Sequence, residues 1–197
     1  MEKMMKQITL ATMLFLSLGQ IQAETTKTYQ LDAGHAKVGF EVSHMMISNV
    51  DGRFTKFTGT IVKGAKLSDM KIETEIDVAS IKTDDTDRDK HLLEGDFFDV
   101  QKFPKITFKS TKISGTEKKL VIEGLLTIKD KTEKVTLKGS MTKEIVDPWG
   151  NTRFGINGSS EIDRKKFNLT FNKVAEFGPV VGDKVKLNIS SEAILKK

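Results

Sequence analysis

Runs of alternating apolar and polar residues constrain the fold of this chain more than any other feature. From Lys71 to Val78, even-numbered residues are isoleucine, threonine or valine and odd-numbered residues are charged. Successive side chains of a β-strand point to opposite faces, so this period indicates a strand with one buried and one wet face. Comparable runs predict strands over residues 28–43, 53–62, 71–78, 105–113, 119–129, 133–145, 153–162 and 184–195. We therefore predict an all-β protein of about eight strands, joined mostly by short turns.

The pattern is interrupted in the first half of the chain. Asp51-Gly52 is typical of a tight turn, after which the next strand returns antiparallel. Phe54 and Phe57 are three residues apart, so they cannot both point to the same face of a regular strand. A bulge or a bend between them would allow both to point inward. Gly59 also favours a bend, as the corners of a barrel require.

Strands of this kind form either a two-sheet sandwich or a closed barrel. Strand lengths of about nine to twelve residues favour a barrel, and so do the inward positions of Gly124, Gly139 and Gly158. A barrel of about eight strands can hold one small ligand in place of a solid core. The glycines either leave room for a ligand or relieve crowding in a filled barrel, and composition does not separate these alternatives.

A short helix is expected between strands, within residues 77–110. Side-chain oxygens of residues 83–85 suit a turn and a helix N-terminus, where they accept hydrogen bonds from free backbone N–H groups. The helix over residues 88–93 is about two turns long and stops at Gly95. Phe97 and Phe98 follow, and Phe103-Pro104 forces an extended re-entry into the next strand. We expect this helix and its paired aromatic residues to act as a plug or lid.

The first 23 residues have the pattern of a secretion signal. Lys3 and Lys6 precede an apolar stretch over residues 8–18 that is too short to span a bilayer, and Ala23 offers a small residue for cleavage. A membrane anchor is the alternative interpretation. Cleavage after Ala23 leaves residues 24–197, the size of one domain. The chain has no cysteine, which fits a bacterial periplasm better than a eukaryotic extracellular space.

The net charge of +5 raises affinity for phosphates, acidic lipid surfaces and nucleic acids alike. The lysines are spread along nearly every expected strand, and no basic-aromatic recognition motif is present. Nucleic acid is therefore not an expected partner. We interpret the lysines as a soluble coat on the outer face of the sheet.

No group of residues in the sequence is typical of a catalytic or metal site. His35, His44 and His91 lack the tight spacing of metal ligands, and no serine lies in a Gly-x-Ser-x-Gly elbow. Paired carboxylates such as Asp84-Asp85 fall in turns or at helix ends, where they usually cap backbone groups. We therefore expect no metal, no cofactor and no enzymatic activity. His44 falls on an inward face, either as a hydrogen-bonded core residue or as a donor near a ligand.

The chain has 12 phenylalanines but only one tryptophan and one tyrosine. Phe has no polar group to satisfy, so it suits a dry interior, and methionine adapts to irregular apolar shapes. These residues would build a packed core or a dry pocket equally well.

Several short motifs occur in a characteristic order along the chain after the signal. They are Tyr29-x-Leu31-Asp32 with His35; Val38-x-Phe40-x-Val42-x-His44; Gly52-x-Phe54; Phe57-x-Gly59; Ile76-Asp77; Ser80-Ile81-x-Thr83; Asp89-x-His91-Leu92; Asp96-Phe97-Phe98-Asp99; Phe103-Pro104-x-Ile106-x-Phe108-x-Ser110; Gly124-x-Leu126-Thr127-Ile128; and Ile162-Asp163-Arg164-x-x-Phe167. In this order and spacing they resemble the YceI family of lipocalin-like periplasmic polyisoprenoid-binding proteins. The chain departs from the family at Ala36, Asp130 and Asn168, which affects turns and strand edges.

The resemblance implies an eight-stranded antiparallel lipocalin-like barrel with a helical lid and an elongated apolar cavity. It implies that the cavity holds an isoprenoid or another long-chain amphiphile, which the protein carries or stores without a catalytic residue set. The residues expected to line the cavity are Phe40, Val42, Met46, Phe54, Phe57, Ile76, Phe97, Phe98, Phe108, Leu126, Leu137, Met141, Ile156 and Phe167. The residues expected near the headgroup are His44, Arg53, His91, Arg164 and Lys165.

Two other functions stay open at this point. One is an enzyme acting on an isoprenoid diphosphate, with His44 or His91 as acid or base. The other is an interaction protein whose basic outer face binds acidic surface polymers. Besides the lipid, the expected partners are a membrane surface, in transient contact, and a second copy of the chain.

Overall fold

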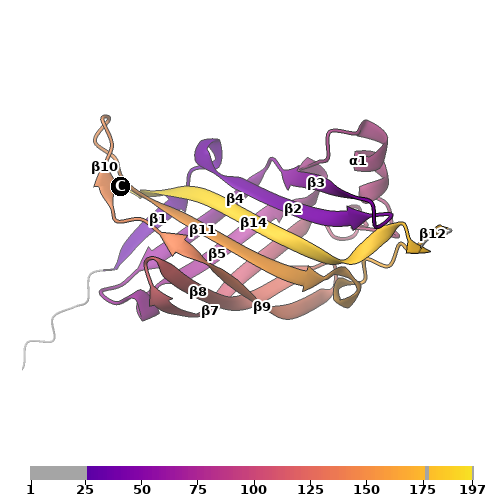
Figure 1. Cartoon of the computed structure of the whole chain (residues 1–197). Helices are drawn as coiled ribbons and strands as arrows, with labels where there is room; N and C mark the ends of the chain where they lie inside the picture. The colour runs from indigo at the N-terminus through magenta and orange to yellow at the C-terminus, as the bar shows by residue number, and fades with distance from the viewer. Residues whose placement is uncertain (1–25, 176–177, 197) are drawn as a thin grey trace, which may run out of the picture.

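Figure 1 shows the computed structural model, which describes residues 26–175 and 178–196. The predicted signal over residues 1–23 lies outside these ranges. The strands are β1 (Lys27–Leu31), β2 (Lys37–His44), β3 (Ser48–Phe54), β4 (Phe57–Lys63), β5 (Lys71–Asp77), β6 (Ile81–Lys82), β7 (Lys105–Thr116), β8 (Lys119–Ile128), β9 (Lys131–Met141), β10 (Ile145–Val146), β11 (Thr152–Asp163), β12 (Val174–Ala175), β13 (Gly178–Pro179) and β14 (Val181–Leu195). The α-helix is α1 (Thr86–Leu92), and short 3₁₀ turns are η1 (Ala33–His35), η2 (Leu67–Asp69), η3 (Val78–Ser80) and η4 (Arg164–Phe167).

The main sheet closes into a barrel because β14 is paired on both edges. One edge pairs antiparallel with β11, from Asp163–Lys184 to Arg153–Ile194. The other edge pairs with β2 and then with β1. The order β11-β9-β8-β7-β5-β4-β1-β14 therefore returns to β11, which makes a closed eight-stranded antiparallel barrel (Figure 1). The prediction of a barrel is confirmed.

Two of the predicted strands are each divided. The run over residues 28–43 forms β1 and β2, which lie in line along one edge of β14 and are separated by η1. The next run is divided at residues 55–56 into β3, which pairs with β2, and β4, which pairs with β1. This break is the bend that Phe54 and Phe57 required, since both side chains are buried.

The predicted turn at Asp51-Gly52 is wrong. The chain turns at Met45–Ile47, and Gly52 lies inside β3 opposite Phe40. A Cβ atom on Gly52 would stand 2.1 Å from Cζ of Phe40, so this glycine makes room for an aromatic ring. A glycine that accommodates a neighbouring side chain is indistinguishable from a turn glycine in the sequence alone.

The inward glycines mostly relieve crowding. A Cβ atom on Gly124 would stand 2.4 Å from the ring of Phe108, and one on Gly139 would stand 1.9 Å from the carbonyl oxygen of Asn157. Gly158 is different, because its nearest neighbour is Leu137 at 3.3 Å and it lines an interior cavity.

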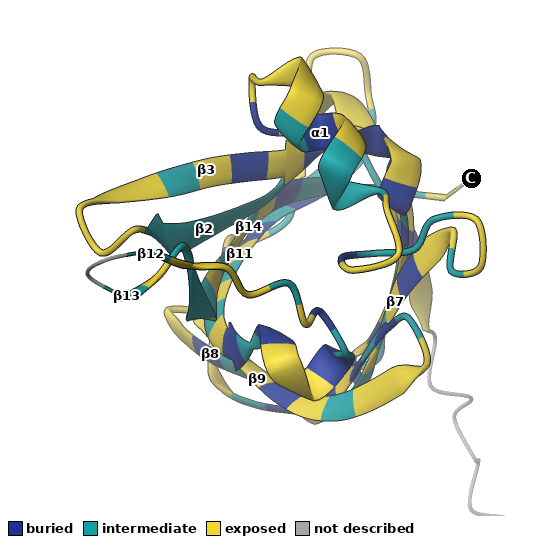
Figure 2. Ribbon diagram, turned by 90° about the vertical axis from the view of Figure 1, so that its right-hand side faces the viewer, coloured by how far each residue is buried: buried dark blue, intermediate teal, exposed yellow. Residues whose placement is uncertain are grey.

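The buried residues form two clusters along the barrel. One cluster includes Tyr29, Phe154 and Ala193 and fills the end where β14 finishes. The other includes Phe54, Ile76 and Ile106, with Leu92 and Phe98 from the helical segment packed against it. The first cluster closes its end of the barrel with side chains, whereas α1 lies at the other end (Figure 2).

The helix predicted over residues 88–93 is present as α1, shifted by one or two residues. The Asp85 carboxylate caps it by accepting hydrogen bonds from the N–H groups of Asp87 and Arg88, at 3.1 and 3.0 Å. Figure 2 shows α1 lying across the rim of the barrel. No helix within the described ranges is long and apolar enough to cross a membrane.

Candidate functional site

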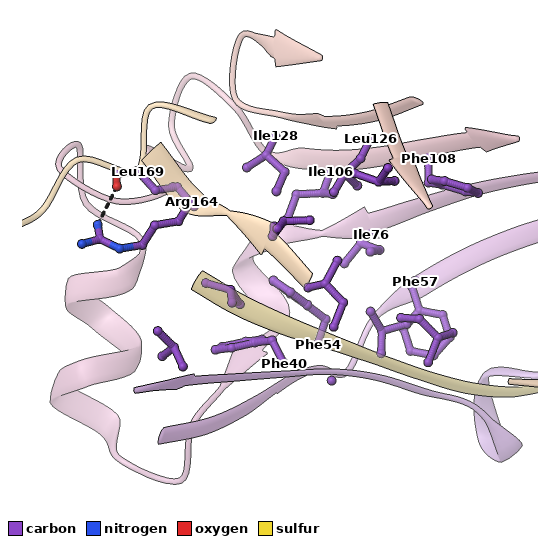
Figure 3. A pocket seen from close by; sticks show the side chains of 18 of the residues that line it. Phe40, Phe54, Phe57, Ile76, Ile106, Phe108, Leu126, Ile128, Arg164 and Leu169 are labelled. Atoms are coloured by element: carbon purple, nitrogen blue, oxygen red, sulfur yellow. Dashed lines mark hydrogen bonds between the residues drawn. The ribbon is translucent and has the colours of Figure 1, made fainter. Parts of the chain in front are cut away.

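An apolar cavity of about 400 Å³ lies inside the barrel. Its wall is made by inward side chains of the strands, among them Phe40, Phe54, Ile76 and Leu126 (Figure 3). Within the described part of the chain, no Asp, Glu or Lys side chain lines it. The few polar groups of the wall include His44, Arg88, His91 and Arg164, all from the end of the barrel that carries α1.

The cavity exists because one side of the barrel does not fill its interior. Toward the α1 end, the inward residues of β2 and β14 are only half-buried: Val38, Phe40, Val42, Val185, Leu187 and Ile189. On the facing wall, by contrast, Ile106 of β7 and Leu126 of β8 are 4% and 6% exposed. Inward apolar side chains of a close-packed core would be fully buried, so β2 and β14 face unfilled space.

Most residues predicted to line an apolar cavity lie in its wall. They are Phe40, Val42, Phe54, Phe57, Ile76, Phe97, Phe98, Phe108, Leu126, Leu137 and Ile156. The strand residues among them occupy inward positions of the alternating pattern. Phe97 and Phe98 come instead from the segment that follows α1.

Three of the predicted lining residues lie elsewhere. Met46 is 71% exposed, because β2 ends at His44 and Met46 belongs to the turn. Met141 is buried in the cluster that fills the closed end of the barrel. Phe167 is 1% exposed at the end of η4, where it shares a buried cluster with Val135 and Ile162. The prediction for Met46 extended the alternation of β2 beyond His44, where that strand ends.

Other lining residues were not among those predicted. Val185, Leu187 and Ile189 of β14 alternate in the sequence, so the same reasoning that found Phe40 could have found them. Leu169 and Phe171 belong to a stretch without periodicity, and no signal in the sequence places them at the cavity.

Three aromatic rings form a cluster at the mouth of the cavity. Phe97 and Phe171 are stacked with centroids 4.8 Å apart, and the ring of His91 meets both edge-on at 5.0 and 4.9 Å. Nε2 of His91 lies 3.1 Å from the Asp96 carboxylate. The backbone N–H of Phe171 also donates to the carbonyl of Asp96 at 3.1 Å, which ties this loop to the segment after α1.

The position of α1 depends on a buried polar network. The Asp89 carboxylate, on a residue that is 7% exposed, accepts hydrogen bonds from the N–H and the hydroxyl of Thr83, both at 2.7 Å. Arg88 donates from Nε to the Thr83 hydroxyl at 2.8 Å and from Nη2 to the Thr83 carbonyl at 2.9 Å. These hydrogen bonds hold α1 over the mouth of the cavity, because both Asp89 and Arg88 bind Thr83 at the start of the helical segment.

Arg164 lies in the cavity wall, but its N–H groups are all used within the chain. Nε donates to the Gly182 carbonyl, and Nη1 donates to the carbonyls of Leu169 (Figure 3) and Phe171, at 2.8, 2.6 and 2.7 Å. Nη2 lies 3.1 Å from the Val181 carbonyl and 3.4 Å from the Asp183 carboxylate. Burial lowers the pKa of this guanidinium below its usual value, and Asp183 opposes that shift. A guanidinium has five N–H donors, so Arg164 has none free for a headgroup.

The structure separates the other predicted headgroup residues into two pairs. His44 and His91 line the cavity. Arg53 lies outside it, paired with the Asp84 carboxylate at 2.9 and 3.0 Å, because its side chain points outward between two inward neighbours on β3. Lys165 also lies outside, 2.7 Å from the Asp183 carboxylate.

His35 belongs to a polar group on the outer surface, away from the cavity. Its Nδ1 lies 2.8 Å from the Asp32 carboxylate, and Glu192 is close by. The hydrogen bond with His35 is the main cause that lowers the pKa of Asp32. The guanidinium of Arg153 lies 2.7 Å from Glu192 and 3.6 Å from Asp32, which explains why these carboxylates gather.

Comparison with known proteins agrees with this architecture. A YceI-like domain matches residues 29–193. Protein YceI of Salmonella newport is 35% identical over an alignment of 200 residues that covers the whole of both chains. The crystal structure of Burkholderia cenocepacia BcnA has a TM-score of 0.72 and 26% identity, covering 82% of this chain and 98% of that one.

Two further solved structures share the barrel. The YCEI protein of Campylobacter jejuni has a TM-score of 0.66 and 26% identity, covering 79% of this chain and 90% of that chain. A polyisoprenoid binding domain from Saccharophagus degradans has a TM-score of 0.61 at 12% identity, covering 85% and 98%, a likeness of fold. The domain match over nearly all the described residues and the full-length identity to Protein YceI show that the chain belongs to the YceI family.

Proposed function

We propose that this protein binds a long-chain isoprenoid or a similar amphiphilic lipid inside its barrel, and that it carries or sequesters this lipid in the periplasm. The observation that carries the proposal is the half-buried inward face of β2 and β14. Apolar surface removed from water contributes about 25 cal/mol per Å², so a ligand that covers this face gains affinity without any charged contact. The Saccharophagus domain of the same fold, named for polyisoprenoid binding, supports this ligand class. The periplasmic location rests on the predicted signal over residues 1–23.

The lipid would lie with its chain inward and its headgroup at the α1 end. The polar wall groups at that end include two guanidinium groups and two imidazole rings, and the described lining contains no carboxylate to repel an anionic head. His44, Arg88 and His91 are the side chains placed to contact it. Arg88 still has N–H groups beyond the two that bind Thr83. Arg164 would instead shape the loop around the headgroup.

We favour a binding protein over an enzyme acting on an isoprenoid diphosphate. His91 packs edge-on against two stacked phenylalanine rings and lies next to Asp96, which suits closure of the mouth. His44 has no carboxylate beside it in the described cavity wall. On the outer face, lysines such as Lys105 and Lys109 are paired with Glu75 and Glu73 across β5 and β7, as expected of a soluble coat.

Native mass spectrometry tests the proposal. Protein purified gently from its own periplasm should carry a single bound lipid species per chain, identified after solvent extraction. Leu187→Trp places an indole in the cavity and should strongly reduce the bound fraction. Asn188→Trp is the matched control, because the next residue of β14 points outward and is exposed. Its bound fraction should equal that of the unaltered protein.

Protein without bound lipid, or Leu187→Trp protein that holds as much lipid as the Asn188→Trp control, would contradict the proposal. Turnover of farnesyl diphosphate during long incubation would instead favour an enzyme. Binding to acidic polymers that is lost in high salt would favour the basic outer face, since exposed charge contacts are screened.

A further inference from the structure

Two hairpins place exposed apolar side chains beside the mouth of the cavity. The turn between β2 and β3 carries Met46, 71% exposed, and Ile47, 82% exposed. The hairpin of β12 and β13 carries Val174, 75% exposed. The turn between β2 and β3 touches the strand end at Gly178 and Val180, because the Met45 N–H donates to the Val180 carbonyl at 2.9 Å and Sδ of Met46 lies 3.1 Å from where a Cβ on Gly178 would stand. Figure 2 shows the hairpins side by side at the rim, away from α1.

The backbone of the first tip is strained. Met45 and Met46 have φ angles of 51° and 61°, and the Ile47 N–H donates to the His44 carbonyl at 3.2 Å. A turn with two successive positive φ angles favours Asn-Gly, because glycine has no Cβ and the short polar side chain of asparagine tolerates the left-handed region better than most others. Met46 gives up stability at one of these positions while its side chain stays 71% exposed. Its presence indicates that the exposed apolar tip has a use.

The tip has the chemistry of a lipid-inserting surface. Residues 42–50 contain no Asp, Glu, Lys or Arg, in a chain in which 30% of residues are charged. Lys173 is exposed next to Val174, where its ammonium can lie at the level of lipid phosphates while the apolar side chains enter below. Continuity with the cavity is direct, since His44 and Val180 line the cavity and flank the tip.

We propose that the surface formed by Met45, Met46, Ile47 and Val174 docks the mouth of the barrel onto a lipid bilayer. This proposal rests on the proposed function, since the docked mouth would receive the lipid from the membrane. A long apolar chain would then move from the bilayer past Val180 into the cavity with little exposure to water. A protruding tip with flexible methionines suits a fluid bilayer, whereas a protein partner would require a matching pocket.

The opposite end of the barrel also carries an exposed aromatic residue, which can be compared with the tip at the mouth. Trp149, the one tryptophan of the chain, is 79% exposed in the loop between β10 and β11. β14 runs from the mouth to that end, about 45 Å at about 3.3 Å per strand residue. The second hydrophobic cluster fills that end, so a lipid has no apolar route there.

Tryptophan emission with phosphatidylcholine vesicles tests which end docks. The unaltered protein should bind the vesicles without a change in its Trp149 emission. In a Trp149→Phe background, Met46→Trp should shift to shorter wavelength when vesicles are added. A shift of Trp149 alone, or no vesicle binding at all, would overturn the proposal.

A second variant separates docking from folding. Met45→Asn with Met46→Gly removes both methionines of the tip and relieves its backbone strain, so the midpoint of urea unfolding should rise. Binding to the vesicles should weaken by at least about tenfold, as expected for loss of buried methionine surface. The control Val146→Asn, at the far end, should bind like the unaltered protein. Equal vesicle binding by the tip variant would overturn the proposal.

Two measurements distinguish the other outcomes. The tip variant should still take up farnesol from detergent solution, which bypasses the membrane. If the unaltered protein takes up farnesol but does not bind vesicles, the docking proposal is wrong and the proposed function stands. If it does not take up farnesol from detergent, the proposed function itself is wrong. A dimer in sedimentation velocity that the tip variant converts to a monomer would assign the surface to a second copy, against the proposal.

Discussion

The ring of Phe40 lies against the backbone of Gly52, its partner across β2 and β3, so closely that residue 52 has no room for a side chain. A Cβ on Gly52 would stand 2.1 Å from Cζ of Phe40 and 2.6 Å from Cε1. The same ring lines the cavity and lies 5.9 Å from the ring of Phe54. Gly52 therefore determines how far the Phe40 ring stands back from the interior.

Gly52→Ala should push the Phe40 ring toward the cavity. We expect a loss of about 1–3 kcal/mol in the free energy of unfolding, typical of overpacking, together with a smaller fraction of lipid-bound protein. Urea unfolding and native mass spectrometry measure the two effects. Gly95→Ala is the control, since a Cβ there meets nothing within 4 Å. Identical behaviour of the two variants would refute this account of the ring.

Arg164 should matter for stability far more than its neighbour Lys165. Its guanidinium holds carbonyls of residues 169, 171, 181 and 182, which a lysine cannot reach together. Arg164→Lys should lower the free energy of unfolding by about 3–5 kcal/mol, because buried acceptors lose their donors. Lys165→Met removes an exposed ion pair with Asp183 and should change the free energy of unfolding by less than about 1 kcal/mol. Equal effects in urea unfolding would show that Arg164 is not the anchor of these loops.

Glu144 should contribute stability that disappears in acid. Burial opposes its ionisation, but hydrogen bonds from Lys63 and Lys27, at 2.7 and 2.9 Å, outweigh it and lower the pKa to about 2 from 4.5. A group with a lowered folded-state pKa stabilises the fold above its unfolded pKa and loses this effect as pH falls through the folded value. The contribution is therefore full above pH 4.5 and fades toward pH 2.

Glu144→Gln should accordingly be less stable than the unaltered protein by about 1–3 kcal/mol at pH 7, and the two should converge near pH 2. Urea unfolding across this pH range measures the difference. Glu73→Gln, which removes an exposed pair with Lys109, should differ by less than about 1 kcal/mol at any pH. If the difference in free energy of unfolding between Glu144→Gln and the unaltered protein stays constant from pH 7 to pH 2, the lowered pKa of Glu144 is not its cause.

Prediction from the sequence succeeded where a feature depends on neighbouring residues and failed where distant segments meet. The strand over residues 71–78 follows from its own alternation, and β5 matches it almost residue for residue. Met46 was misplaced because alternation does not show where a strand ends. The role of Arg164 depends on carbonyls that only the folded chain brings together, and the same holds for the Phe171 ring against His91.

Phe171→Ala should speed the exchange of bound lipid. The residue stacks on Phe97 and meets His91 edge-on, and aromatic pairs of this kind are worth about 0.5–1.5 kcal/mol each. Without this ring the mouth opens more easily, so association and dissociation rates of a dansyl-labelled farnesyl amine should both rise, by up to about tenfold. The affinity should change little, because most of the buried apolar wall remains. Stopped-flow fluorescence measures both rates, and Trp149→Ala at the far end should leave them unchanged. Dissociation that accelerates without faster association would mean that Phe171 holds the ligand and does not gate its entry.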